Sequence, residues 1–341
     1  MKIDMKKIKI GQIGIGHNHG EEKMKAVRKF PELFEIVGYA EENERWIEKR
    51  GKNPGYEGLP RISVEEVIER SDAVLIECDV WDLTKYAKMC VDAGKHIHMD
   101  KPASGTLEEY KSLLDLAKTK NLTVQLGYMY RYNPAVLRCL EYIKNDNLGE
   151  IHAINAEMST FHSPEYKKWL KNFGGGIMYI LGSHLVDLIV YVMGEPKKIT
   201  SFLHHSGLDG LDLEDNNLAV LEYDKALVRI FVSSIEVNGF GRRQFVVSGS
   251  RGTVNICPLE SPIQMTYSDT DMIGNPWENI CHTEPIKTVD LSCRYDDMVQ
   301  DFYAYVMGTK QNPFTYEHDY LVQKVLSEIV GGVRFNGKNI D

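Results

Sequence analysis

The sequence has no hydrophobic run long enough to cross a membrane. Its most apolar stretch, from Ile177 to Met193, is interrupted by Ser183, His184 and Asp187 and is shorter than the roughly 20 residues that a membrane span requires. We expect this stretch to form a buried helix. The segment 1–9, which is rich in lysine, leads directly into a strand pattern and lacks the apolar core and cleavage site of a secretory signal. We therefore expect a cytoplasmic protein with no membrane partner.

Closely spaced cysteines and an excess of basic charge are also lacking. The six cysteines are scattered, with no C-x-x-C pair, which argues against a zinc site and a disulfide framework, so we expect no metal ion. The net charge is -9 and the basic residues are not clustered, which argues against nucleic acid as a partner. The 341 residues are enough for two globular domains.

The first 132 residues alternate between strand patterns and helix patterns. Capping-box patterns at Ser63 and Thr106, and a candidate cap at Asp82, indicate where intervening helices begin. Parallel strands are joined by such helical crossovers, so we predict an α/β fold with a doubly wound parallel sheet of the Rossmann type in residues 1–132. The expected strands lie at 8–15, 34–40, 73–78, 95–99 and 122–127.

The pattern changes near residue 149, and we expect a second domain at 133–341. Helix patterns return at 297–307 and 319–330, and the pattern alone leaves open which domain these C-terminal helices cover. The second domain is predicted to be α+β with a mainly antiparallel sheet. Its alternating segments lie at 151–158, 219–223, 227–234 and 243–248.

A glycine-rich segment, GIGHNHG at 14–20, joins the first expected strand to the first expected helix. Backbone N–H groups and the helix dipole at such a junction can bind a pyrophosphate. The placement therefore predicts a dinucleotide cofactor. The candidate residues are Gly14, Gly16, His17, Asn18 and His19, with His19 standing where a third glycine is usual.

Acidic residues at the ends of strands are further candidates for cofactor binding. Glu41 follows the second strand, where this fold uses an acid to accept hydrogen bonds from the adenosine ribose. A carboxylate there repels a 2′-phosphate, so we expect NAD rather than NADP; a solvated loop acid is the alternative for Glu41. Asp79 and Asp100 follow the third and fourth strands.

Residues 93–102, AGKHIHMDKP, resemble a signature of the glucose-fructose oxidoreductase/inositol dehydrogenase/rhizopine-catabolism (Gfo/Idh/MocA) family, with Asp100 in place of the commoner Glu. The segments GYMYRYNP at 127–134 and GGG…GSHLVD at 174–187 are similar to two further motifs of the family. The resemblance spans nearly the whole chain. It implies a Rossmann domain followed by an α+β domain with a large open sheet, often assembled into homodimers or homotetramers.

The resemblance also implies the catalytic residues. It gives Lys101 contacts to the nicotinamide ribose and the substrate, and a cis bond to Pro102. The position of Lys101 at a strand end directs it to the crevice where such sheets bind ligands. His184 is the acid/base candidate, because an imidazole can exchange the hydroxyl proton near neutral pH. A core histidine is the alternative for His184.

The sequence departs from the family pattern at Ile180, where an acidic residue often stands one helical turn before the histidine. An apolar wall at Ile180 is compatible with a glycoside or a bulkier sugar. Asp187 lies one turn after His184 and either orients the imidazole or belongs to a core polar network. The candidate substrate contacts are Arg131, His162, Trp169 and Ile180, with core packing as the alternative for Trp169.

These residues together predict an NAD(H)-dependent oxidoreductase that acts on a carbinol carbon of a sugar, polyol or glycoside. Two alternatives stay open. One is a non-catalytic NAD-binding regulator or scaffold, which the presence of Lys101 and His184 disfavours. The other is an oxidoreductase whose tightly bound cofactor is recycled between two substrates.

Overall fold

The computed structural model describes residues 6–260, 262–287 and 290–335. The chain divides into two compact units, each made from two stretches of sequence. The first unit combines Met1–Met129 with Val289–Tyr320, and the second combines Tyr130–Thr288 with Leu321–Asp341. None of the helices in the described part of the chain has the length and apolar character needed to cross a membrane.

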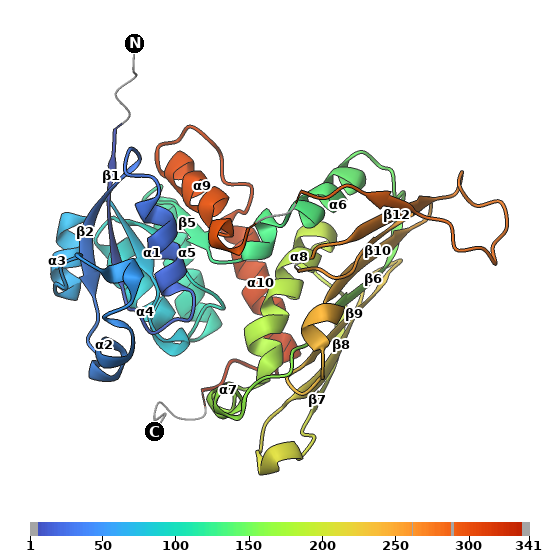
Figure 1. The fold of residues 1–341 in the computed structure, drawn as a ribbon, viewed down its shortest axis with the longest axis horizontal. Coiled ribbons are helices and arrows are strands. Elements are labelled where there is room, and N and C mark those ends of the chain that lie inside the picture. Colours follow the sequence, from blue (N-terminus) through green and yellow to red (C-terminus); the bar gives the residue numbers. More distant parts are fainter. Residues whose placement is uncertain (1–5, 261, 288–289, 336–341) are drawn as a thin grey trace. The chain divides into compact units, whose positions relative to one another are not determined.

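The first unit contains a five-stranded sheet in the order β2-β1-β3-β4-β5, and all neighbouring strands are parallel (Figure 1). The strand order reverses between β1 and β3, which creates a crevice at the carboxyl ends of these strands. The predicted doubly wound parallel sheet is therefore confirmed. The strands are β1 (Ile8–Ile13), β2 (Phe34–Ala40), β3 (Ala73–Ile76), β4 (His96–Met99) and β5 (Val124–Leu126).

Helices cover both faces of this parallel sheet. Right-handed crossovers place α1 on one face and α3, α4 and α5 on the other. Helix α9 packs beside α1, and the Gln125 amide in β5 donates a hydrogen bond to the Met298 carbonyl of α9 over 3.1 Å. The helices are α1 (Gly20–Arg28), α2 (Glu44–Arg50), α3 (Val64–Arg70), α4 (Leu83–Asp92), α5 (Leu107–Thr119) and α9 (Asp296–Val306).

Local capping signals set the starts of several helices. Ser63 and Thr106 both form the predicted capping boxes, with reciprocal hydrogen bonds to Glu66 and Glu109. The expected cap at Asp82 is wrong, because its side chain makes no capping hydrogen bond. The chain enters α4 through a short 3₁₀ turn, Val80–Asp82, which places Asp82 in helical geometry instead of the extended geometry of a capping residue.

The second unit contains an eight-stranded sheet in the order β13-β12-β11-β10-β6-β9-β8-β7. Strands β6 and β9 are parallel and the other neighbours are antiparallel, which confirms the predicted mainly antiparallel sheet. The strands are β6 (Ile151–Glu157), β7 (Lys198–His204), β8 (Asn216–Glu222), β9 (Leu227–Ser233), β10 (Gln244–Gly249), β11 (Gly252–Ile256), β12 (Met265–Asp269) and β13 (His282–Glu284).

Helices α6 (Pro134–Lys144) and α8 (Ser183–Met193) lie on one face of this antiparallel sheet (Figure 1). Side chains of the opposite face keep much of their exposure, 58% for Phe202 and 61% for Leu227. The buried helix expected from Ile177 is present, but it begins with a π-helical turn, Met178–Gly182, directly before α8. The remaining helices are α7 (Pro164–Leu170) and α10 (Tyr316–Ile329).

Candidate functional site

The glycine turn between β1 and α1 requires its first glycine. Gly14 has φ +85°, and a Cβ atom there would lie 2.3 Å from the Cys78 Cα. At Gly16 a Cβ would lie 2.7 Å from Nε1 of Trp46. The absence of side chains at these two positions therefore lets the segment after β3, and helix α2, approach the backbone of the turn.

Glu41 lies beside the glycine turn. One oxygen of its carboxylate accepts the Ile15 backbone N–H over 2.8 Å, and the other accepts the Asn43 N–H over the same distance. An ionised carboxylate offers about four lone-pair sites, so Glu41 retains acceptor capacity for a further donor. The structure thus brings Glu41 and the turn together at the carboxyl edge of the sheet.

Arg50 and Trp46 on α2 are site residues that the sequence analysis missed. Arg50 Nη1 donates to the carbonyls of Ile15, Gly16 and His17 over 3.1, 2.8 and 2.6 Å, and Nη2 donates to Asn18 Oδ1 over 2.7 Å. The guanidinium carbon lies 4.6 Å from the centre of the Trp46 ring. The hydrogen bonds from Arg50 therefore fix the positions of the backbone carbonyls in the turn. The four-residue spacing of Trp46 and Arg50 on a helix after Glu41 was the available signal.

Trp46 also reaches Asp79, which was predicted to bind the cofactor. The Trp46 Nε1–H donates to Asp79 Oδ2 over 2.8 Å. Burial raises the pKa of Asp79 to about 6, although the Trp46 hydrogen bond partly opposes this shift. Asp79 is thus brought to the same turn as Glu41, in an environment that disfavours its charge.

Asp100 belongs to a buried ionic cluster beneath the turn. Lys23 Nζ lies 2.6 Å from Asp100 Oδ2 and 2.9 Å from Glu77 Oε1, and His17 Nδ1 lies 3.0 Å from Asp100 Oδ2. Burial alone would raise the pKa of Asp100, but His17 and Lys23 hold it well below its ordinary value. Burial raises the pKa of Glu77, and the nearby Lys23 charge offsets only part of that shift.

Lys101 follows directly after β4 and is 3% exposed. Its backbone N–H donates to Asp100 Oδ1 over 2.7 Å, and its bond to Pro102 is cis, as the family resemblance implied. The pKa of His19 is lowered mainly by burial, with a smaller contribution from the positive charges of Lys23 and Lys101. Asp100 thus links the backbone of Lys101 to His17 of the glycine turn.

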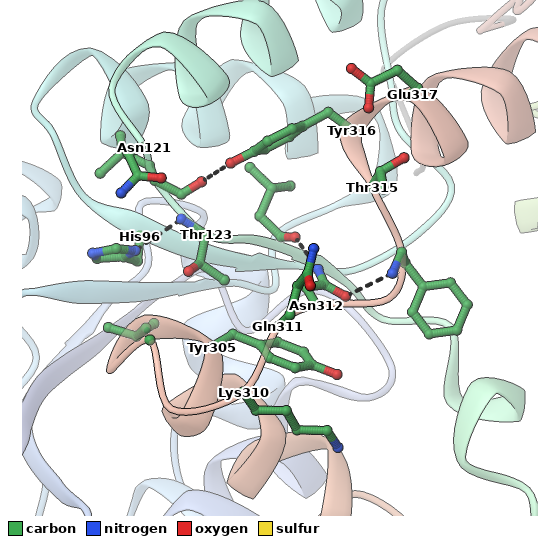
Figure 2. A pocket seen from close by; sticks show the side chains of 15 residues that line it. His96, Asn121, Thr123, Tyr305, Lys310, Gln311, Asn312, Thr315, Tyr316 and Glu317 are labelled. Atoms are coloured by element: carbon green, nitrogen blue, oxygen red, sulfur yellow. Dashed lines mark hydrogen bonds between the residues drawn. The ribbon is translucent and has the colours of Figure 1, made fainter.

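A separate cavity of about 590 Å³ lies at the opposite, amino-terminal edge of β4 and β5. Figure 2 shows its polar lining, in which Tyr316 donates to the Leu122 carbonyl over 2.6 Å and the Thr123 N–H donates to His96 Nδ1 over 2.9 Å. Parallel α/β sheets bind ligands at the carboxyl ends of their strands. This cavity is therefore distinct from the edge that carries Asp100 and Lys101.

In the second unit, His184 on α8 is 3% exposed and packs against Tyr130. The two rings are nearly perpendicular, at 81°, with centroids 4.9 Å apart. The Tyr130 hydroxyl donates to Glu260, which is also paired with Arg243. No sequence pattern predicted a role for Tyr130, Glu260 or Arg243, which lie far from His184 along the chain.

Asp187 and Arg131 form a buried, two-pronged ion pair. Arg131 Nε donates to Asp187 Oδ2 over 3.0 Å and Nη2 donates to Oδ1 over 2.7 Å. Asp187 therefore pairs with Arg131, a partner that the sequence did not predict. The two hydrogen bonds hold the Arg131 guanidinium in a fixed orientation. Ile180, 5% exposed, lies in the π-helical turn before α8.

His162 and Trp169 belong to an aromatic row. The rings of His162 and Tyr166 are stacked, with their centroids 4.2 Å apart. The Trp169 ring lies next in the row: its centroid is 5.1 Å from that of Tyr166 and 4.8 Å from that of Phe173, which it meets edge-on. Burial lowers the pKa of His162 to about 4, helped by the charge of Arg243. Packing is thus the visible role of Trp169, and a substrate contact stays a prediction for both residues.

Comparison with known proteins matches both halves of the chain to one family. The model described as "Oxidoreductase family, NAD-binding Rossmann fold" matches residues 8–128, and the GFO/IDH/MocA C-terminal domain matches residues 136–255. An uncharacterized oxidoreductase of Schizosaccharomyces pombe is 26% identical over 283 residues, covering 78% of this chain and 76% of its own length.

Two further relatives carry a named activity. The scyllo-inositol 2-dehydrogenase (NADP(+)) IolW of Bacillus subtilis is 27% identical over 119 residues, which are 34% of this chain and 33% of that protein. The structure of UDP-N-acetylglucosamine 3-dehydrogenase GnnA from Acidithiobacillus ferrooxidans has a TM-score of 0.79 at 17% identity, covering 96% of this chain and 97% of that chain. The matched domains and the fold agree: this chain belongs to the Gfo/Idh/MocA family of oxidoreductases.

Proposed function

We propose that the chain is an NAD(H)-dependent dehydrogenase that transfers a hydride between nicotinamide and a carbinol carbon of a sugar, polyol or glycoside. The observation that carries the proposal is the position of Lys101, buried at the carboxyl end of β4 and linked through Asp100 to His17 of the glycine turn. A small carbohydrate or polyol as substrate is supported by the similarity to scyllo-inositol 2-dehydrogenase.

Lys101 and His184 are the proposed catalytic residues. Bound NAD supplies the hydride acceptor. Oxidation breaks the carbinol C–H bond, the electron pair leaves as hydride, and the hydroxyl proton passes to His184 as the C=O bond forms. The ammonium of Lys101 stabilises the alkoxide that develops on the substrate oxygen. Arg131, fixed by Asp187, is proposed to position a substrate hydroxyl.

We propose NAD as the preferred cofactor because Glu41 lies beside the glycine turn. A ribose 2′-hydroxyl can donate to this carboxylate, whereas a 2′-phosphate would be repelled by it. The relative IolW is named as an NADP(+)-dependent enzyme. Activity with NAD and with NADP must therefore be compared directly.

We propose that Ile180 selects for glycosides or bulkier sugars. The residue is buried and apolar and lies in the turn that precedes His184. An apolar wall cannot accept hydrogen bonds from the hydroxyls of a free polyol, and it favours an alkylated or larger ring. A substrate panel in which only free inositols react would contradict this assignment.

The decisive experiment follows nicotinamide reduction at 340 nm with NAD and NADP against a panel of sugars, inositols and glycosides. NAD-dependent turnover of one class supports the proposal and names the substrate. Cofactor binding without turnover across the panel would favour a regulator or scaffold. Nicotinamide that stays with the purified protein and is reduced and reoxidised without release would instead favour a recycled cofactor.

A further inference from the structure

Two imidazoles and a carboxylate meet beneath the glycine turn. His17 Nδ1 lies 3.0 Å from Asp100 Oδ2, and His19 Nδ1 lies 3.5 Å from the same oxygen. All three atoms lie within 4.8 Å of one another. The proposed dehydrogenase mechanism assigns neither imidazole a step in hydride or proton transfer.

We propose that His17, His19 and Asp100 form a binding site for a divalent transition-metal ion of the zinc class. Such an ion binds imidazole nitrogen and carboxylate oxygen at about 2.0–2.2 Å, so neighbouring ligands of a tetrahedral site lie about 3.3–3.6 Å apart. The distances from Asp100 Oδ2 to His17 Nδ1 and His19 Nδ1, 3.0 and 3.5 Å, are close to these ligand–ligand distances. Small side-chain movements would place all three atoms around one ion.

Glu77 offers a fourth ligand for the same ion. Its carboxylate is fully buried, and Oε2 lies 4.0 Å from His17 Nδ1. Neither Glu77 Oε2 nor His19 Nδ1 has a hydrogen-bond partner among the residues that the structure describes. A buried polar atom without a partner is costly, and a shared metal ion would satisfy both atoms at once.

The Lys23 ammonium lies beside the same carboxylates and would repel a bound metal ion. It lies 2.6 Å from Asp100 Oδ2 and 2.9 Å from Glu77 Oε1, and so holds the two carboxylates in place. A carboxylate oxygen has two lone pairs, so Asp100 Oδ2 can accept from Lys23 and still bind a metal ion. With neutral imidazoles, two carboxylates and one ammonium sum to a charge of about −1, which a dication changes to about +1.

The competing arrangement is a plain hydrogen bond from a protonated His17 Nδ1 to Asp100, which needs no ion. The two arrangements differ in a measurable way. A metal site binds one ion with saturation and depends on His19, whose Nδ1 makes no hydrogen bond to a described residue. A hydrogen-bonded pair binds no ion at micromolar concentration.

The test uses the full chain with Cys281→Ser and Cys293→Ser, because these two thiols are exposed and could bind metal on their own. The protein is treated with a chelator, dialysed and titrated with Co²⁺. Visible absorption reports tetrahedral coordination, and competition with Zn²⁺ is followed by calorimetry. We expect one ion per chain. No saturable absorption at up to millimolar Co²⁺ overturns the proposal.

Variants separate this site from adventitious binding. His19→Gln should weaken Co²⁺ binding by on the order of 100-fold, since even outer-shell changes cost 10–100-fold. His96→Gln is the matched control, because His96 lies in the same unit at the opposite end of β4 and should leave binding unchanged. Lys23→Met should tighten binding by removing a nearby positive charge.

Circular dichroism first establishes that each variant is folded. His17→Gln provides a second ligand deletion in case His19→Gln fails to fold. Binding that persists unchanged in both His17→Gln and His19→Gln overturns the proposal. Because the readout is metal binding without substrate or NAD, its result is independent of whether the dehydrogenase proposal holds.

Discussion

At the scale of single residues, Arg50 ties the glycine turn to α2 through hydrogen bonds to three consecutive carbonyls. We expect Arg50→Ala to raise the Kd for NADH about tenfold, which corresponds to about 1.4 kcal/mol, because the turn loses its preformed shape. Arg50→Lys should not restore affinity, since one ammonium cannot span the same set of acceptors. The Kd is measured by NADH fluorescence.

The control for Arg50 is Lys49→Ala, a neighbouring basic residue on the same helix that should leave the Kd unchanged. Tighter NADH binding in Arg50→Ala would contradict the prediction. That outcome would indicate that the guanidinium occupies the place of the cofactor.

Lys101 is the residue on which the proposed chemistry depends most. Lys101→Ala should lower kcat by about 10²–10⁴-fold, the usual contribution of a group that assists proton transfer. The Kd for NAD should change much less, because the turn is held by Glu41 and Arg50. Steady-state kinetics and NADH binding are compared with Lys88→Ala, an exposed lysine on α4. An unchanged kcat in Lys101→Ala would rule out the assigned role.

Asp79 makes stability depend on pH. Burial raises its pKa to about 6, above the usual value of about 3.9 for an unfolded chain. The folded state therefore binds this proton more tightly, so ionisation of Asp79 costs stability above pH 6 and the cost disappears below about pH 4.

We accordingly expect Asp79→Asn to raise the urea midpoint at pH 8 and to leave it nearly unchanged at pH 4. The amide oxygen of Asn can still accept the Trp46 hydrogen bond, so packing is preserved. Asp82→Asn, a change in the neighbouring 3₁₀ turn, serves as the control at both pH values. An equal shift at pH 8 and pH 4 would show that charge is not the cause.

At the scale of helices and strands, capping determines where α5 begins. Thr106→Ala removes the side-chain acceptor for the Glu109 N–H and should lower the free energy of unfolding by about 1 kcal/mol. Ser112→Ala, at an exposed position inside the same helix, should be neutral or slightly stabilising. Urea unfolding followed by circular dichroism compares the two variants, and an equal loss in both would exclude a capping effect.

Signals that act within a few residues made most elements predictable. The capping boxes at Ser63 and Thr106 are confirmed because their partners, Glu66 and Glu109, lie three residues away. The cap at Asp82 failed because a 3₁₀ turn precedes α4. The π-helical turn before α8 was also missed, since no residue type in Met178–Gly182 specifies a widened turn.

The candidate site was predictable where it follows strand ends. Glu41 and Asp100 come directly after β2 and β4, and Asp79 lies three residues after the end of β3, so their common edge follows from the parallel sheet. The arrangement around His184 was not predictable in the same way, because Tyr130 lies 130 residues from Glu260 and 113 residues from Arg243. Such pairs depend on the tertiary fold.

At the scale of the whole molecule, we propose that the chain assembles into a homodimer or homotetramer through the partly exposed face of the eight-stranded sheet. Leu227→Glu should lower the mass measured by sedimentation, because a buried carboxylate without a partner disfavours association. Leu208→Glu is the matched control on a 3₁₀ turn outside the sheet, with a similar exposure of 57%. A wild-type protein that sediments as a monomer would contradict the proposed assembly.

The discontinuous first unit has a consequence for synthesis on the ribosome. Its sheet is encoded by the first part of the chain, but α9, whose Met298 carbonyl accepts from Gln125 of β5, belongs to the last part. Domains generally fold in the order in which they emerge. The cofactor-binding unit, although it is made first, therefore cannot be completed until every strand of the second unit has been translated.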